Sequence, residues 1–294
     1  MEISKVGVVG AGLMGHGIAQ VSAQAGYDVV LCEIDQGCLD EGLGKIDKQL
    51  SRSVEKGKME QEQADEVKGR IHGTLDQQDL AECNLVIEAI TEELEKKREF
   101  FGQIDEIVGD DAIFASNTSS LPVIELATAT GRAERFLGLH FFNPAQVMPL
   151  VEAIRAITTT DEAFDAALEY GRALKKTVIP TSDKAGFIVN RLLVPYMLDA
   201  IRAYEEGVAS VDNIDAAMRG GAAHPMGPFT LLDFVGLDTT KFIAEIMYTE
   251  FREKRFAPPP TLNKLVAAGW YGKKSGKGFY DYSGDQPTPV DLKV

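Results

Sequence analysis

Short apolar runs alternate with amphipathic segments along the first part of the chain. Most of these runs are continuously apolar, which is typical of strands that are buried on both faces of a sheet. The longer segments between them carry apolar residues at helical spacing. This order predicts βαβ units and a mostly parallel sheet. The expected strands are Val6–Val9, Asp28–Cys32, Leu85–Glu88, Ile113–Ala115, Phe136–Phe142, Val147–Ile154 and Thr177–Ile179, and the expected helices are Leu13–Ala25, Gln36–Lys56, Glu92–Val108, Val123–Thr128 and Asp161–Lys176.

The pattern becomes mostly helical after Ser182. A long helical period runs from Gly186 to Glu206, and Ser210 is placed to cap the helix that follows. We therefore expect an α/β domain over residues 1–183 and a helical C-terminal domain over residues 184–294, with the boundary near Thr181–Lys184. The other helices expected in the second domain are Pro228–Val235, Leu237–Phe251 and Leu262–Ala268.

Composition and charge narrow the class of protein. The chain has 294 residues, of which 45% are hydrophobic and 26% charged, as in an ordinary globular protein. No stretch approaches the ~18 consecutive apolar residues of a membrane-spanning helix. Lys and Arg total 30 against 45 Asp and Glu, a net charge of −15, which repels nucleic-acid phosphates and anionic membranes. We expect neither a nucleic-acid partner nor a membrane partner.

The cysteines and the start of the chain favour a cytoplasmic protein. Cys32, Cys38 and Cys83 form no CxxC pair, so the sequence predicts neither a disulfide framework nor a metal site. Reduced thiols fit the cytoplasm. Glu2 is followed directly by an apolar strand, without the basic start and cleavage site of a signal peptide.

A glycine-rich turn, GAGLMG, joins the first expected strand to the first expected helix. In this context Gly10 allows the tight turn, Gly12 lets a pyrophosphate approach the backbone, and Gly15 lets helix and strand pack closely. Leu13 and Met14 complete the turn at the helix N-terminus, where free N–H groups and the helix dipole attract phosphates. The turn therefore predicts a dinucleotide-binding, Rossmann-like domain.

The second expected strand is followed by Glu33, ~20 residues past the glycines, where a carboxylate accepts hydrogen bonds from the ribose hydroxyls of NAD. The same carboxylate would repel the 2′-phosphate of NADP. Neither Ile34 nor the two residues after it supply an Arg or Lys to offset that repulsion. We therefore expect NAD as the cofactor.

One histidine and one glutamate are candidates for acid/base chemistry. His140 follows the apolar run Phe136–Leu139, where a parallel strand delivers it to the ligand-binding carboxyl edge of the sheet. Histidine suits removal of an alcohol proton near neutral pH. Glu152, in an apolar setting, suits the partner that orients the imidazole. Taken alone, His140 also fits a hydrogen-bonded histidine at a strand end, and Glu152 also fits a charged residue on an edge strand.

Four motifs, in order along the chain, carry a resemblance to a known family. They are Ser116–Leu121 (SNTSSL), Gly138–Pro144 (GLHFFNP), Gly186–Arg191 (GFIVNR) and Pro225–Pro228 (PMGP). From about Lys5 to Tyr280 the sequence resembles the L-3-hydroxyacyl-CoA dehydrogenases, and within them the bacterial 3-hydroxybutyryl-CoA dehydrogenases. The resemblance implies a Rossmann-like domain, an all-α C-terminal domain and a homodimer formed largely through the latter. It also implies NAD(H)-linked interconversion of (S)-3-hydroxyacyl-CoA and 3-oxoacyl-CoA.

The resemblance also implies roles for single residues. His140 matches the general acid/base and Glu152 its partner, while Ser119 and Asn190 match the polar groups around the reacting oxygen of the substrate. The residues that match cofactor contacts are Glu92, Lys97, Ser119, Asn143 and Lys274.

A positive stripe is a candidate contact for the phosphates of CoA. Lys45, Lys48, Arg52 and Lys56 are spaced to share one helix face in an otherwise acidic chain. The alternative is a solvated face whose charges pair with neighbouring carboxylates of the same helix. The family places CoA near this region, which makes Arg52 and Lys56 the expected contacts.

Two positions depart from the commonest family pattern, and two other functions stay open. Glu33 replaces the more usual Asp, and His16 stands where a small residue is common. A dehydrogenase of a sugar acid or another small hydroxy acid is an alternative on the same fold. A nucleotide-binding structural or sensor protein is the alternative outside enzymes, and the retained His140, Glu152, Ser119 and Asn190 argue against it.

Overall fold

The computed structural model describes residues 2–292 of the chain. The backbone divides into two compact units between Phe187 and Ile188. Over the described residues, no helix combines the length and the apolar character needed to cross a membrane.

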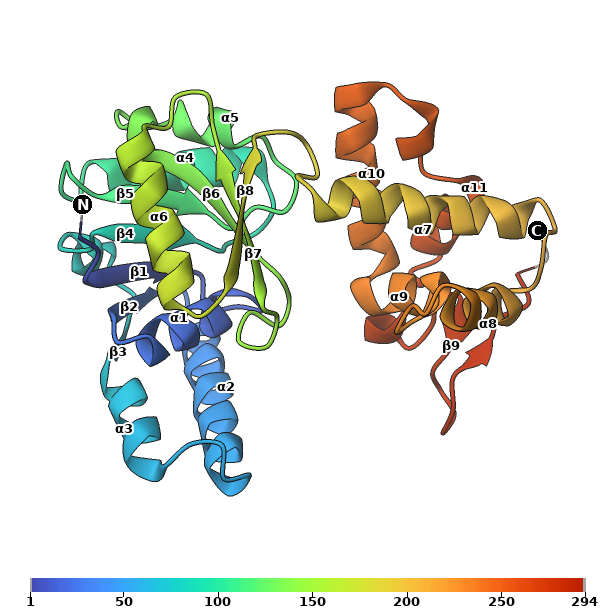
Figure 1. Ribbon diagram of the computed structural model, residues 1–294, viewed down its shortest axis with the longest axis horizontal. Helices are drawn as coiled ribbons and strands as arrows, with labels where there is room; N and C mark the ends of the chain where they lie inside the picture. Colours follow the sequence, from blue (N-terminus) through green and yellow to red (C-terminus); the bar gives the residue numbers. More distant parts are fainter. Residues whose placement is uncertain (1, 293–294) are drawn as a thin grey trace. The chain divides into compact units, whose positions relative to one another are not determined.

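The first unit is built on one eight-stranded sheet with the strand order β3-β2-β1-β4-β5-β6-β7-β8 (Figure 1). The strands from β3 to β6 in this order pair in parallel, β7 is antiparallel to β6, and β8 is parallel to β7. The predicted Rossmann-like, mostly parallel sheet is confirmed. The strands are β1 (Lys5–Val9), β2 (Asp28–Cys32), β3 (Ile71–Thr74), β4 (Leu85–Glu88), β5 (Ile113–Ser116), β6 (Phe136–Phe141), β7 (Leu150–Arg155) and β8 (Thr177–Ser182).

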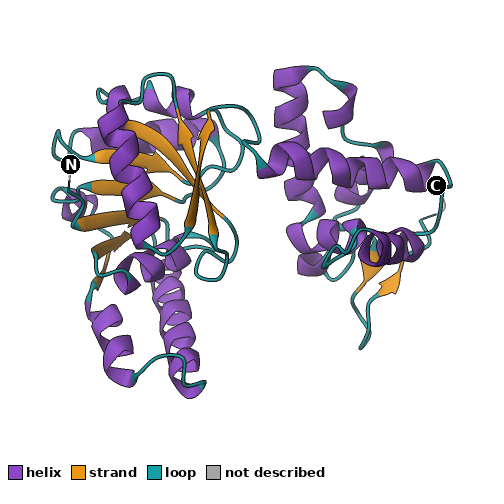
Figure 2. Cartoon of the chain, in the orientation of Figure 1, coloured by secondary structure: helices purple, strands orange, loops and turns teal. Residues whose placement is uncertain are grey.

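Helices cover both faces of this sheet (Figure 2). Buried side chains of α1, α2, α3 and α6 belong to one apolar cluster with the sheet, and those of α4 and α5 belong to a second. The helices are α1 (Gly15–Gln24), α2 (Gln36–Glu55), α3 (Gln61–Gly69), α4 (Leu94–Asp105), α5 (Val123–Ala127) and α6 (Asp161–Ala173), with short 3₁₀ turns η1 (Gln77–Leu80) and η2 (Ala133–Arg135).

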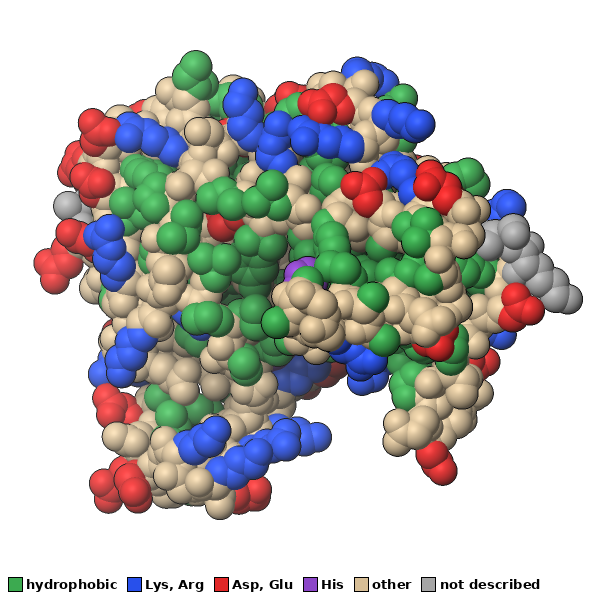
Figure 3. Space-filling view, turned by 45° about the vertical axis from the view of Figure 1, so that its right-hand side comes forward, with side chains coloured by type: hydrophobic (Ala, Val, Ile, Leu, Met, Phe, Trp, Pro, Cys, Tyr) green, Lys and Arg blue, Asp and Glu red, His purple; other side chains and the backbone are tan. Residues whose placement is uncertain are grey.

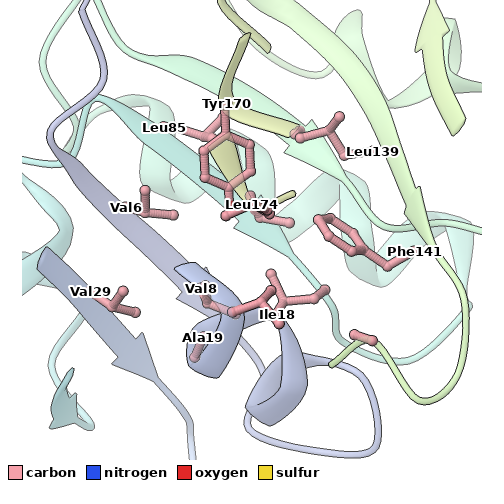
Figure 4. Packing of buried hydrophobic residues seen from close by; sticks show 14 of the residues in the cluster. Val6, Val8, Ile18, Ala19, Val29, Leu85, Leu139, Phe141, Tyr170 and Leu174 are labelled. Atoms are coloured by element: carbon pink, nitrogen blue, oxygen red, sulfur yellow. The ribbon is translucent and has the colours of Figure 1, made fainter. Parts of the chain in front are cut away.

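The packing between the sheet, α1 and α6 fixes the position of the glycine-rich turn. Ile18 and Ala19 of α1 lie beside Val8 of β1, and Tyr170 reaches this layer from α6 (Figure 4). The buried Tyr170 hydroxyl lies 2.6 Å from the Ser22 hydroxyl, so the polar end of this large side chain has a partner. This hydrogen bond ties the C-terminal end of α1 to α6, whereas the packing of Ile18 and Ala19 against Val8 places the start of α1 beside the carboxyl end of β1.

Residues 57–84, to which the sequence analysis assigned no element, contain α3, β3 and η1. In α3 only Ala64 and Val67 are buried, so its apolar stripe is too narrow to predict a helix from the sequence. β3 lies at the edge of the sheet and pairs with β2 alone, which lets it remain half polar.

One expected strand begins later than predicted, at Leu150 and not at Val147. The N–H groups of Val147 and Met148 donate to the carbonyl of Pro144 and close a turn there. These N–H groups are consequently not available to a sheet ladder.

The second unit is helical, as predicted, with one small addition. Its helices are α7 (Val189–Glu205, with Pro195 inside), α8 (Val211–Gly221), α9 (Pro228–Val235), α10 (Leu237–Phe251) and α11 (Pro260–Ala267), and its 3₁₀ turns are η3 (Lys254–Phe256) and η4 (Lys273–Ser275). The addition is a two-stranded antiparallel pair, β9 (Tyr280–Asp281) and β10 (Thr288–Pro289), for which the sequence predicts no strands.

Two buried carboxylates hold the second unit together. Asp215 of α8 accepts hydrogen bonds from two backbone N–H groups in the first turn of α9, at 2.7 and 2.9 Å. Asp233 of α9 accepts hydrogen bonds from the N–H groups of Phe279 and Tyr280, at 2.9 and 2.8 Å. Burial raises the pKa of Asp233 to about 6. Asp215 therefore anchors α9 to α8, and Asp233 anchors the start of β9 to α9.

Candidate active site

The glycine-rich turn has the geometry of an anion-binding loop. Gly10 has a φ of 94°, which residues with a Cβ rarely adopt, and its N–H donates to the carbonyl of Cys32. A Cβ on Gly15 would collide with the carbonyl of Gly10, so α1 packs closely on the turn. No side chain caps the N-terminus of α1 and its first turn holds no acidic residue. The N–H groups at this helix end can therefore bind an anion.

Glu33 places a carboxylate beside this turn. Its Oε2 accepts a hydrogen bond from the N–H of Ala11 at 2.7 Å, and its Oε1 accepts one from the N–H of Ile34 at 2.8 Å. A Cβ added at Gly12 would meet no heavy atom within 4 Å, so the backbone is open to a ligand on that side. An open turn, a free helix N-terminus and a fixed carboxylate fit a dinucleotide.

His140 and Glu152 form a buried pair. They lie directly opposite each other in the antiparallel ladder of β6 and β7, where cross-strand neighbours meet. His140 Nδ1 lies 2.7 Å from Glu152 Oε2, and the two residues are 6% and 0% exposed. Because an ionised carboxylate only accepts, Nδ1 carries a proton in this pair. The rings of Phe142 and Phe187 lie against the imidazole, so its surroundings are largely apolar.

A second buried charge network lies at the ends of β4 and β5. Lys97 of α4 is 1% exposed, and its ammonium lies 2.5 Å from Glu88 Oε1 and 3.1 Å from Glu92 Oε2. Glu88 Oε2 also accepts a hydrogen bond from the hydroxyl of Ser116 at 2.7 Å. The Lys97 ammonium, expected to contact the cofactor, is therefore placed between two carboxylates of its own chain.

Glu92 fixes the loop that carries Ser119. Its Oε1 accepts hydrogen bonds from the Thr118 hydroxyl at 2.6 Å, the Ser119 N–H at 2.7 Å and the Ser119 hydroxyl at 3.2 Å. Burial acts to raise the pKa of Glu92, but the charge of Lys97 and these hydrogen bonds outweigh it and hold the pKa below its usual value. Glu92 therefore stays ionised and keeps the Ser119 loop in place.

Two residues of this site were not singled out in the sequence. The Asn117 side chain accepts a hydrogen bond from the Phe141 N–H at 2.9 Å and so ties the Ser119 loop to the strand of His140. Glu88 anchors Lys97. A charge at the end of an otherwise apolar strand was a usable signal for Glu88, as it was for Glu33, whereas an isolated Asn in a polar loop gives none.

The other predicted site residues lie in three places. Asn143 is exposed and lies two residues past the end of β6, before a cis peptide bond to Pro144. Asn190 belongs to the second unit, in the first turn of α7. Lys274 also belongs to the second unit, where its ammonium donates to Asp238 at 2.8 Å.

The positive stripe on α2 is only partly neutralised. Lys45 pairs with Glu41 at 2.7 Å, and Asp47 pairs with Lys68 of α3. Lys48, Arg52 and Lys56 are exposed, and each lacks an ion-pair partner among residues 2–292. Lys and Arg side chains gather on the lower projection of Figure 3, which is formed by α2 and α3. These three cations remain available to an anionic ligand.

Lys97→Met is expected to lower the free energy of unfolding by about 3 kcal/mol, because a buried carboxylate that loses its counter-ion is strongly destabilising. Urea unfolding followed by circular dichroism measures this change. The matched control is Lys96→Met, since the neighbouring ammonium pairs with Glu93 at 2.8 Å in solvent and is worth less than about 1 kcal/mol. Equal losses in the two variants would contradict the role of Lys97 as a buried counter-ion.

The fold and the turn together define a dinucleotide-binding dehydrogenase: the turn and Glu33 suit NAD, and the buried His140–Glu152 pair suits proton transfer. Residues 5–184 match the family described as 3-hydroxyacyl-CoA dehydrogenase, NAD binding domain, and residues 186–282 match the corresponding C-terminal domain. The chain belongs to the 3-hydroxyacyl-CoA dehydrogenase family. It is an NAD-dependent dehydrogenase, and the predicted cofactor and family are confirmed.

Individual relatives match over nearly their whole length. The 3-hydroxybutyryl-CoA dehydrogenase of Mycobacterium tuberculosis is 48% identical over 282 residues, which cover 95% of this chain and 99% of that protein. The mitochondrial hydroxyacyl-coenzyme A dehydrogenase of Homo sapiens is 46% identical over 287 residues, which cover 95% and 91%. The crystal structure of (S)-3-hydroxybutyryl-CoA dehydrogenase from Ralstonia eutropha is 41% identical and matches with a TM-score of 0.94, covering 96% of this chain and 100% of that chain.

Proposed function

We propose that this protein interconverts (S)-3-hydroxybutyryl-CoA and acetoacetyl-CoA by hydride transfer to and from NAD. The His140–Glu152 pair, with a 2.7 Å contact, is the observation that carries the proposal, because this chemistry needs one base of fixed tautomer. The relatives that carry the name 3-hydroxybutyryl-CoA dehydrogenase support the choice of substrate.

His140 acts as the general base in the oxidation of the alcohol. The Nδ1–H bond to Glu152 leaves Nε2 with a lone pair, which takes the hydroxyl proton of the substrate. NAD, when bound, supplies the hydride acceptor. In the reverse direction the protonated His140 returns the proton to the oxygen. Glu152 holds the tautomer and stabilises the imidazolium that forms.

Ser119 and Asn190 stabilise the charge that develops on the substrate oxygen during reduction of the ketone. Glu92 holds the Ser119 loop through hydrogen bonds from the Thr118 hydroxyl and the Ser119 N–H, so the loop is in place before the substrate binds. The Ser119 hydroxyl, which donates to Glu92 at 3.2 Å, turns its proton to the substrate oxygen when the substrate binds.

The cofactor is held by the glycine-rich turn and by groups on later elements. The N–H groups of the turn, including those of Leu13 and Met14, bind the pyrophosphate, and Glu33 binds the ribose hydroxyls. The further contacts are Glu92, supported by the buried Lys97, together with Ser119, Asn143 and Lys274.

Arg52 and Lys56 bind the phosphates of CoA, because they are exposed cations without an ion-pair partner among residues 2–292.

Residues 184–294 form the dimerisation and substrate domain of a cytoplasmic homodimer.

The test is NADH absorbance with acetoacetyl-CoA as substrate, with NADPH in parallel and free acetoacetate as the control. We expect fast oxidation of NADH with the thioester and none with the free acid. A preference for NADPH would overturn the role of Glu33. Turnover of free acetoacetate at the same rate would overturn the CoA assignment and favour a dehydrogenase of small hydroxy acids.

A further inference from the structure

We propose that His16 is a positioning residue that fixes the peptide between Gly12 and Leu13 for binding of the dinucleotide. His16 is the second residue of α1 and is 7% exposed. Its Nδ1 lies 2.6 Å from the carbonyl oxygen of Gly12, four residues earlier. Because a carbonyl oxygen only accepts, the imidazole carries its proton on Nδ1 and donates.

Because the peptide bond is planar, the hydrogen bond from His16 to the Gly12 carbonyl also orients the N–H of Leu13. In a trans peptide the C=O and the N–H point in opposite directions. The carbonyl of Gly12 and the N–H of Leu13 belong to one such unit. Since the imidazole holds the carbonyl on the side of α1, the Leu13 N–H is directed to the opposite side.

The Gly12–Leu13 peptide needs this hydrogen bond because the backbone of Gly12 is itself only weakly restrained. Glycine rotates freely, and a Cβ at Gly12 would meet no heavy atom within 4 Å. Gly12 and Leu13 are both exposed, so packing restrains their peptide weakly. If this peptide turned over, it would replace an N–H donor with a carbonyl oxygen, and a carbonyl oxygen repels phosphate.

The inference rests on the assignment of NAD to this turn and concerns affinity only. A preorganised loop binds more tightly because less ordering is required on association. The imidazole of His16 donates to Gly12 in the glycine-rich turn, whereas His140 pairs with Glu152 across β6 and β7, so turnover at saturating NADH is expected to stay unchanged.

Three variants separate the hydrogen bond from the bulk of the ring. In His16→Asn the amide nitrogen stands where Nδ1 stands, so the donor is kept. In His16→Gln the donor is moved further along the side chain, and in His16→Ala it is lost. We expect the Kd for NADH, measured by fluorescence titration, to rise about three- to tenfold in the Ala and Gln variants, the range of one hydrogen bond. The Asn variant should stay within about twofold of the parent protein, because it keeps the hydrogen bond.

Ser22→Ala is the matched control on the same helix. The Ser22 hydroxyl donates to the carbonyl of Ile18 at 2.7 Å, which is the same four-residue spacing but away from the turn. This variant should lower the melting temperature and leave the Kd for NADH unchanged. An unchanged Kd in His16→Ala, or an equal loss in His16→Asn and His16→Ala, overturns the proposal. Because the readout is NADH binding, a wrong choice of acyl substrate does not affect it.

Discussion

His140→Gln is expected to lower kcat for acetoacetyl-CoA reduction by about 10²- to 10⁴-fold, the usual contribution of a positioned general acid or base. A glutamine amide occupies similar space and retains a donor, but it neither accepts nor releases a proton near neutral pH. Steady-state NADH absorbance measures the loss.

The same variant should bind NADH within about twofold of the parent protein, since His140 lies on β6 and the glycine-rich turn follows β1. A thermal melt provides the control for folding. Turnover that survives intact in His140→Gln or in His140→Ala would exclude His140 as the acid/base. An equal loss of NADH affinity and of kcat would instead indicate a role in holding the cofactor.

The elements of the sheet were largely predictable because its strands are buried on both faces. Fully buried runs without a charged residue, such as Val6–Val9 of β1 and Phe136–Leu139 of β6, leave little choice of secondary structure. β3 and α3 were not predictable for the opposite reason. Each buries only one or two of its residues and leaves the others partly or fully exposed, so its sequence is largely polar.

The sequence indicates candidate site residues one by one but does not predict their geometry. Nothing in the spacing of His140 and Glu152 states that they face each other, because twelve residues separate them. The antiparallel ladder of β6 and β7 brings them together, and the loop that reverses the chain sets its register.

Lys97 shows the limit of assigning roles by motif. On an amphipathic helix a lysine is ordinarily taken to be exposed. Here Glu88 at the end of β4 and Glu92 in the loop before α4 draw its ammonium into the interior, and only the fold places them there. The burial of Lys97 bears on the proposed function, because Glu92, one of its two carboxylate partners, also accepts a hydrogen bond from the Ser119 N–H. Through Glu92 and Glu152 the two networks hold the proposed donor Ser119, after β5, and the proposed base His140, on the neighbouring strand β6.

Glu152→Gln is expected to lower kcat by about 10³-fold while leaving the Kd for NADH within about twofold. If the amide oxygen faces His140, the tautomer is kept but the imidazolium loses its counter-charge. If the amide nitrogen faces His140, the ring is driven to the wrong tautomer. Both arrangements weaken proton transfer, and neither removes a cofactor contact. A large loss of NADH affinity with unchanged turnover would contradict the assigned role.

The stability of Glu152→Gln distinguishes a functional carboxylate from a structural one. Burial of an ionised carboxylate beside a neutral imidazole is costly, and Glu152→Gln replaces it by a neutral group that can still hydrogen-bond His140. We therefore expect a melting temperature equal to or above that of the parent protein, with activity lost. The double variant His140→Gln/Glu152→Gln should be no slower than His140→Gln alone, because Glu152 acts only through the imidazole. Losses that multiply in the double variant would show that Glu152 contributes to the reaction independently of His140.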